Sequence, residues 1–156
     1  MTSKIEEKLS SMDIDLPPSA APVANYVNYV ISGNQVFISG QLPMKDGKPL
    51  ATGQVGEGCT VEEAQAAARQ CGINMLSHLK LACDGNLDRV TRCIKLGVFV
   101  NCDGKFTEQP KVANGVSDFM VEVFGEAGNH SRAAVGVSQL PFGVAVEVDG
   151  IFEIAA

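Results

Sequence analysis

Arg132 and Glu147 are the residues of this chain whose types and positions most clearly suggest chemistry. They lie in two apolar, strand-like segments between Ser131 and Ile151 that are rich in valine and alanine. An unpaired buried charge costs several kcal/mol, so these side chains must pair, reach solvent or line a cleft. In a cleft, a guanidinium can hold a carboxylate through two parallel hydrogen bonds, and a glutamate can act as a general base toward water. The structural alternative is an ion pair between the two residues or with an interface partner.

The rest of the chain predicts the elements that would position this pair. Apolar residues at i, i+3, i+4 spacing indicate helices, and β-branched or alternating apolar residues indicate strands. Thr60 and Glu63 form a capping box, and Gly33-Asn34 is typical of a hairpin turn. The order β-β-α-β-α-β-β predicts an α+β domain with a mixed sheet and two helices on one face. The expected strands are 25–32, 35–40, 91–101, 132–140 and 144–154, and the expected helices are 2–12, about 60–84 and a third beginning at Gln109-Pro110.

The domain organisation follows from length and composition. Residues 1–21 are expected to form an N-terminal extension, with a short helix capped by Thr2 or Ser3 and a proline-rich linker. Residues 22–156 are expected to form a single domain, because a chain of 156 residues with 46% hydrophobic composition supports one ordinary core. The segment 43–58 is rich in glycine and polar residues and is expected to be a loop.

The uncovered face of the sheet predicts an oligomer. The expected strands carry valine, isoleucine and phenylalanine on both of their alternating sets of positions. A face of this kind is too apolar to meet only water, so we expect it to pack on other copies of the chain. A closed cyclic assembly is favoured because it leaves no open interface.

Composition excludes several classes of partner. The formal net charge is −6 with scattered lysines and arginines, which argues against nucleic acid as the main partner. No segment approaches the ~20 apolar residues of a membrane span, and the first residues lack a signal-peptide profile, so we expect a soluble, cytoplasmic protein. The five cysteines and two histidines show no zinc-type spacing. We therefore expect reduced, packed thiols and no metal.

Three blocks of residues together point to a known family. They are Phe-Ile-Ser-Gly-Gln-Leu-Pro at 37–43, Val-Phe-Val at 98–100, and the run from Ser-Arg-Ala through Leu-Pro to Val-Glu-Val at 131–148. In these blocks the chain resembles the Rid family of reactive intermediate deaminases, also called the YjgF family and formerly described as L-PSP endoribonucleases or translation inhibitors. The resemblance runs from about residue 22 to the end. Residues 1–21 look like the extension of a longer subgroup.

This resemblance implies a fold, an assembly and a reaction. The fold is chorismate-mutase-like, and the assembly is a homotrimer with a central barrel and ligand clefts between adjacent subunits. The reaction is hydrolysis of enamines and imines, such as 2-aminoacrylate, to 2-keto acids and ammonia without a cofactor. By position in the blocks, Arg132 grips the substrate carboxylate, Glu147 positions or activates water, and Tyr26 and Asn114 line the cleft. Gln41 either ends the hairpin or brings its backbone N–H near the ligand.

One position departs from the family pattern, and it leaves alternatives open. Well-studied members carry cysteine two residues after the arginine, where this chain has Ala134. The enzyme hypothesis is an enamine/imine deaminase. The alternative is a non-catalytic trimer that binds a small carboxylate such as a 2-keto acid in the same clefts. RNA cleavage, the older family description, is disfavoured by the acidic balance and by the lack of a histidine pair for acid–base work.

Overall fold

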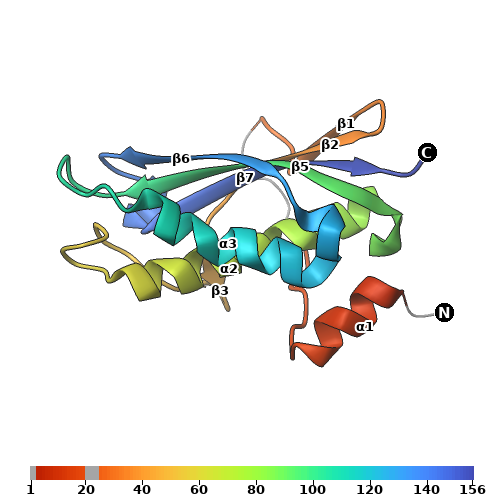
Figure 1. Cartoon of the computed structure of the whole chain (residues 1–156), viewed down its shortest axis with the longest axis horizontal. Coiled ribbons are helices and arrows are strands. Elements are labelled where there is room, and N and C mark those ends of the chain that lie inside the picture. The colour runs from red at the N-terminus through yellow and green to blue at the C-terminus, as the bar shows by residue number, and fades with distance from the viewer. Residues whose placement is uncertain (1–2, 20–24) are drawn as a thin grey trace.

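The computed structural model describes residues 3–19 and 25–156. It contains one five-stranded sheet with the order β1-β2-β7-β5-β6, and the long helices α2 and α3 lie on one face of it (Figure 1). Strands β5 and β6 are parallel, and the other neighbours are antiparallel. The sheet strands are β1 Tyr29–Ser32, β2 Gln35–Gln41, β5 Val90–Asn101, β6 Ser131–Val137 and β7 Val146–Ile154, and the helices are α1 Lys4–Ser11, α2 Val61–Ala82 and α3 Gln109–Phe124. The predicted α+β class and mixed sheet are confirmed.

Helix starts follow the expected capping chemistry. In α2, the Thr60 hydroxyl accepts a hydrogen bond from the Glu63 backbone N–H, and the Glu63 carboxylate accepts one from Thr60 N–H. Ser3 caps α1 in the same way by accepting from Glu6 N–H, while Thr2 lies outside the described residues. Each cap satisfies a backbone donor that the helix itself cannot pair. The expected domain boundary between residues 21 and 22 also lies outside the described residues.

Three expectations differ from the structure by more than two residues. The first strand begins at Tyr29, because its regular pairing with β2 starts at the pair Tyr29–Ile38 and the residues before it meet β2 only through Ser39, whose backbone N–H and hydroxyl donate to the Asn28 and Val27 carbonyls. Strand β6 ends at Val137, because its partner β5 ends opposite it at Asn101. The expected loop 43–58 contains a small hairpin of β3 (Met44–Lys45) and β4 (Lys48–Pro49). Its two turn residues, Asp46 and Gly47, both have positive φ.

The core lies between the sheet and the helices α2 and α3. Alternate residues of β5 and β7 face the helices and are buried, which makes the other set of each strand face away. Helix α1 adds Leu9, which is 3% exposed, to the same core. The buried strand residues include Leu96, Val98, Val100, Val146, Val148 and Phe152, and the buried helix residues include Ala68, Cys71, Met75, Val116, Phe119 and Met120.

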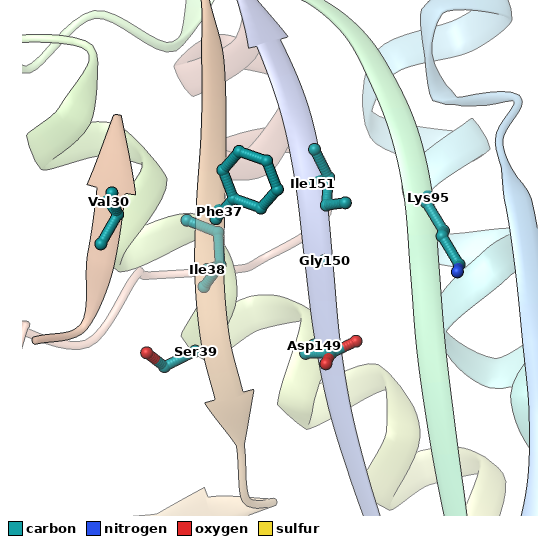
Figure 2. A pocket seen from close by; sticks show the side chains of 8 residues that line it. All are labelled: Val30, Phe37, Ile38, Ser39, Lys95, Asp149, Gly150 and Ile151. Atoms are coloured by element: carbon teal, nitrogen blue, oxygen red, sulfur yellow. The ribbon is translucent and has the colours of Figure 1, made fainter. Parts of the chain in front are cut away.

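The opposite sheet face carries no helix in the described part of the chain. One row of residues across this face runs from Val30 through Phe37 and Ile151 to Lys95 on successive strands. Figure 2 shows these side chains around a shallow hollow of about 330 Å³, with Asp149 at its edge. Val30 and Phe37 are exposed. The packing of this face on other subunits stays a prediction.

Candidate functional site

Arg132 lies on edge strand β6, and its side chain turns toward the helices. Its register partner on β5 is Leu96, which is fully buried on the helix face. The guanidinium donates through Nη1 to Asn114 Oδ1 at 2.8 Å and to Ser117 Oγ at 3.1 Å, and through Nη2 to the Pro110 carbonyl at 3.4 Å. All three acceptors belong to α3, so that helix fixes the direction of the arginine. Asn114, which was expected to line the cleft, is thus in direct contact with Arg132.

A short relay of hydrogen bonds extends behind Arg132. His130 Nδ1 lies 2.6 Å from the Gly128 carbonyl, which can only accept, so Nδ1 carries the proton. His130 Nε2 then accepts from the Ser117 hydroxyl at 2.8 Å, and Ser117 Oγ in turn accepts from Arg132. Sequence reasoning did not select Ser117 or His130. Spacing along the sequence could have indicated both residues. Ser117 is one helical turn beyond Asn114, and His130 precedes Arg132 by two residues.

Arg132 retains hydrogen-bonding capacity. A guanidinium has five N–H donors, and the contacts with α3 engage three of them. In residues 3–19 and 25–156, no carboxylate forms an ion pair with Arg132. The structural alternative, an ion pair with Glu147 inside one chain, is therefore not what the structure contains. Two donors remain for a planar anion.

Glu147 lies on the other face of the sheet. It occupies β7 between the buried residues Val146 and Val148, opposite Phe99 of β5, so its side chain points away from the helices. Its carboxylate lies against Gly40, where any Cβ would overlap it. Burial raises the pKa of Glu147 above its ordinary value, and the neighbouring Asp149 raises it further. Among the described residues Glu147 forms no ion pair.

A cavity of about 630 Å³ opens beside Gly40. Tyr26 and Gln41, two of the expected site residues, line it, and Tyr26 is 53% exposed. Gln41 Nε2 donates to the Ser39 carbonyl at 2.8 Å, which leaves Gln41 Oε1 to accept from His78 Nε2 at 3.2 Å. Gln41 therefore contributes its side chain to the cavity wall. Its expected role through the backbone N–H stays a prediction.

His78 and Phe142 also line this cavity, and sequence reasoning selected neither for the site. Because His78 Nε2 donates to Gln41, its Nδ1 accepts from the Ser19 hydroxyl at 2.6 Å. Burial lowers the pKa of His78, which favours the uncharged ring. The contact between Ser19 and His78 joins residues 59 positions apart, so no local pattern could have revealed it.

The structure thus divides the expected site into two groups. Arg132 and Asn114 lie on the helix side of the sheet, whereas Glu147 lies on the bare side next to Gly40. Strand β5 separates the two strands that carry Arg132 and Glu147. Strands lie ~5 Å apart, so about 10 Å and the thickness of the sheet separate the charged residues. A small ligand cannot contact both side chains of one chain.

The site region contains no thiol at the position where the family pattern has one. Ala134 lies on β6 opposite Val98, on the same side as Arg132, and packs partly against the core. All five cysteines are buried and free of disulfides.

No group of three potential metal ligands occurs in the described part of the chain. The helices of that same part include none long and apolar enough to cross a membrane.

Sequence comparison identifies relatives over almost the whole chain. A family model described as "YjgF/chorismate mutase-like, putative endoribonuclease" matches residues 6–149. Protein TCP17 of Trypanosoma cruzi is 52% identical over 154 residues, which are 98% of this chain and 96% of that protein. A 2-iminobutanoate/2-iminopropanoate deaminase of Dermatophagoides farinae is 25% identical over 141 residues, covering 90% of this chain and 94% of the relative.

Structural comparison agrees with this result. The crystal structure of an Agrobacterium tumefaciens protein of unknown function matches with a TM-score of 0.91 and 46% identity. The match covers 97% of this chain and 92% of the other, so it includes the described N-terminal segment as well as the sheet. The family model, the relatives and the shared fold show that this chain belongs to the YjgF/chorismate mutase-like family, as its three sequence blocks predicted.

Proposed function

We propose that this protein hydrolyses reactive 2-imino acids, and the enamines in equilibrium with them, to 2-keto acids and ammonia in clefts shared by two copies of the chain. Water adds to the carbon of the C=N bond, and the tetrahedral adduct expels ammonia: R–C(=NH)–COO⁻ + H₂O → R–CO–COO⁻ + NH₃. No electrons are transferred, so the reaction needs no redox cofactor. The observation that carries the proposal is an arginine fixed in direction but free of any carboxylate partner in the described chain.

In this reaction Arg132 binds the substrate carboxylate. Asn114 and Ser117 hold the guanidinium from one side, and its remaining donors can form two parallel bonds to a carboxylate. Arginine stays protonated at all working pH values, so the anchor does not change during the reaction. The relative of Dermatophagoides farinae named as an iminobutanoate and iminopropanoate deaminase supports a substrate with this carboxylate.

Glu147 transfers the protons. As a carboxylate it takes a proton from the attacking water and gives it to the imine nitrogen, which forms the C(OH)(NH₂) adduct. It then takes the hydroxyl proton of the adduct and gives it to the same nitrogen, so that the C–N bond breaks, ammonia leaves and the C=O bond forms. General acid–base catalysis is most effective when the pKa of the group approaches the working pH. The raised pKa of Glu147, caused by burial and by Asp149, supports this double role.

Two copies are needed because the two groups lie on opposite faces of one sheet. Arg132 of one subunit can meet Glu147, Gly40 and Tyr26 of the next only if the contact is heterologous, with different surfaces facing each other. Heterologous contacts that close on themselves form rings. We propose the homotrimer that the family resemblance predicts, with the bare sheet faces turned inward and one cleft at each subunit boundary.

The test follows keto-acid formation from imines produced in situ by an amino-acid oxidase, with semicarbazide as a competing trap. Wild-type protein should increase keto-acid release and decrease semicarbazone, and Arg132→Ala and Glu147→Gln should abolish the effect. Lys8→Ala and Glu7→Gln, which replace an exposed lysine and an exposed glutamate of α1 away from the sheet, are the matched controls. If wild type and Arg132→Ala both equal buffer, the proposed reaction is excluded.

Ala134 favours one second candidate, a trimer that binds 2-keto acids without turnover. This candidate keeps the Arg132 anchor but gives Glu147 no chemical role. Saturable binding of 2-ketobutyrate that is lost in Arg132→Ala and unaccompanied by imine hydrolysis would support it. An RNA substrate should be assayed in parallel, since cleavage that both Arg132→Ala and Glu147→Gln abolish would support the endoribonuclease description of the family.

A further inference from the structure

The cavity beside Gly40 is much larger than a three-carbon imino acid needs. Its volume of about 630 Å³ lies within the range of pockets that hold drug-sized ligands. Gly40 is one of its lining residues, and the Glu147 carboxylate, which does not itself line the cavity, lies against Gly40, so a substrate attacked by Glu147 can direct its side chain past Gly40 into this space. The cavity is therefore the natural place for the substrate side chain.

The cavity wall is mainly apolar, and its apolar residues come from four separate parts of the chain. The N-terminal linker contributes two prolines, the segment before β1 a tyrosine, the segment after β2 a leucine and a methionine, and the turn before β7 a phenylalanine. None of the lining residues is a lysine or an arginine, so within the described chain the cavity offers a substrate carboxylate no cation. These apolar wall residues are Pro17, Pro18, Tyr26, Leu42, Met44 and Phe142.

Most polar side chains in the cavity are already paired within the protein. Asn74 Nδ2 donates to the Leu42 and Met44 carbonyls at 3.0 Å each, and both ring nitrogens of His78 have partners. In the described chain the Ser77 hydroxyl has no partner, and that residue is 7% exposed. Apart from Asp46, an acidic residue that also lines the cavity, hydrogen-bonding capacity there is largely used, and an uncharged substrate side chain gains chiefly by burying apolar surface.

The N-terminal segment forms a fixed wall of this cavity. At one end, the Asp88 carboxylate accepts hydrogen bonds from the Lys4 and Ile5 backbone N–H groups at 3.0 Å, and Leu9 is buried in the core. At the other end, Ser19 donates to His78. The segment between these anchors carries the two prolines against the cavity.

Phe142 adds an aromatic side chain to the cavity lining, on a backbone in a strained conformation. It is 82% exposed and has a φ of 58°, a left-handed conformation that is a genuine outlier for a bulky residue. Costly backbone conformations of this kind cluster at active sites and ligand clamps.

From these observations we infer that the site selects 2-imino acids with large apolar or aromatic side chains. This inference rests on the proposed function and extends it to substrate class. The carboxylate binds Arg132 of the neighbouring copy, the C=N carbon lies near Glu147, and the side chain fills the cavity between the proline wall and Phe142.

The experiment compares imines that an amino-acid oxidase forms from phenylalanine and from alanine, and measures binding of phenylpyruvate and pyruvate by calorimetry. For wild type, kcat/KM should be at least about tenfold higher for the phenylalanine-derived imine, and phenylpyruvate should bind more tightly. Phe142→Gly and Pro18→Ala should lower the ratio of kcat/KM for the phenylalanine-derived imine to that for the alanine-derived imine severalfold. Phe142→Tyr should retain the preference. Leu81→Ala and Pro49→Ala, exposed residues outside the cavity, are the matched controls.

The outcomes separate this inference from the proposed reaction. Equal rates on both imines, unchanged in Phe142→Gly, would overturn the side-chain assignment and leave the reaction intact. Tight phenylpyruvate binding that requires Phe142, without acceleration of either imine, would overturn the reaction and support the cavity as an apolar side-chain subsite. If phenylpyruvate does not bind and neither imine is hydrolysed faster, both the side-chain assignment and the proposed reaction are overturned.

Discussion

Arg132 and Glu147 point to opposite faces of the same sheet, with the whole width of β5 between their strands. A shared site would need both side chains, because Arg132 can bind an anion and Glu147 can act as a general base. Arg132 has donors free for an anion, and the Glu147 carboxylate has no cation in the described chain. The arrangement suits a cleft completed by a second subunit, and it makes the assembly a condition of the chemistry.

The first prediction is complementation between two inactive variants. If each cleft takes Arg132 from one subunit and Glu147 from the next, mixed trimers of Arg132→Ala and Glu147→Gln contain some clefts with both native residues. After the variants are unfolded together and refolded in equal amounts, about a quarter of wild-type activity should return, because each half of a cleft is native with a probability of about one half.

The control for this experiment is each variant refolded alone, which should stay inactive. Mass spectrometry of the intact assembly would verify that mixed trimers formed. Verified mixed trimers without activity would contradict a cleft that combines Arg132 and Glu147 from different subunits.

A second prediction concerns Ser117 as a positioning residue. Its hydroxyl joins Arg132 to His130, at 3.1 Å and 2.8 Å respectively. Ser117→Ala removes one of the bonds that orient the guanidinium, and hydrogen bonds to charged groups contribute ~1.5–3 kcal/mol. KM for the imine should rise about tenfold or more while kcat changes much less, because the carboxylate anchor is loosened and Glu147 is untouched.

Ser117→Thr keeps the hydroxyl and should restore KM. Ser131→Ala, at an exposed serine next to Arg132, is the matched control. If kcat fell as strongly as kcat/KM, or if Ser117→Thr behaved like Ser117→Ala, the positioning role would be refuted.

A third prediction concerns pH. The general base must be ionised, and both burial and Asp149 raise the pKa of Glu147 above its ordinary value of 4.5. The rate should therefore fall on the acidic side at a higher pH than an ordinary glutamate would give. Asp149→Asn removes a negative neighbour, makes ionisation of Glu147 easier, and should move this fall to lower pH. A profile of kcat/KM against pH measures the shift, and Glu7→Gln, at an exposed glutamate of α1, is the control that should leave the profile in place.

Sequence patterns predicted those parts of the fold that depend on neighbouring residues. The capping box of Thr60 and Glu63 and the apolar stripe of α3 both follow from contacts within one helical turn, and both are present. The Asp46-Gly47 turn was also readable as a local signal, but the surrounding glycine-rich composition concealed it.

The arrangement of the site could not be predicted in this way. Alternation along a strand shows which residues of that strand share a face of the sheet. It does not show whether residues on two different strands lie on the same face. The separation of Arg132 from Glu147 depends on β5 lying between their strands, and that order is a long-range property. The contact of Ser19 with His78 is likewise long-range, so the wall formed by the N-terminal segment had no signal in the local sequence.

The last prediction concerns the packing of α3 on α2, because α3 carries the residues that hold Arg132 in place. Helices α2 and α3 approach so closely at Gly115 that a Cβ there would overlap the Gln65 backbone carbonyl. Because a backbone atom cannot move aside as a flexible side chain can, Gly115→Ala must push α3 away from α2. Overpacking of this kind costs ~1–3 kcal/mol, which corresponds to a decrease in Tm of roughly 2–4 °C per kcal/mol for a chain of this size.

The displaced helix carries Asn114 and Ser117, so Gly115→Ala should also raise KM for the imine. The control is Gly104→Ala, since a Cβ on Gly104 meets nothing within 4 Å. Thermal unfolding at equal protein concentration compares the two variants, because the Tm of an oligomer depends on concentration. Equal Tm values for Gly115→Ala and Gly104→Ala would show that α3 can shift freely and that its contact with α2 does not fix the arginine.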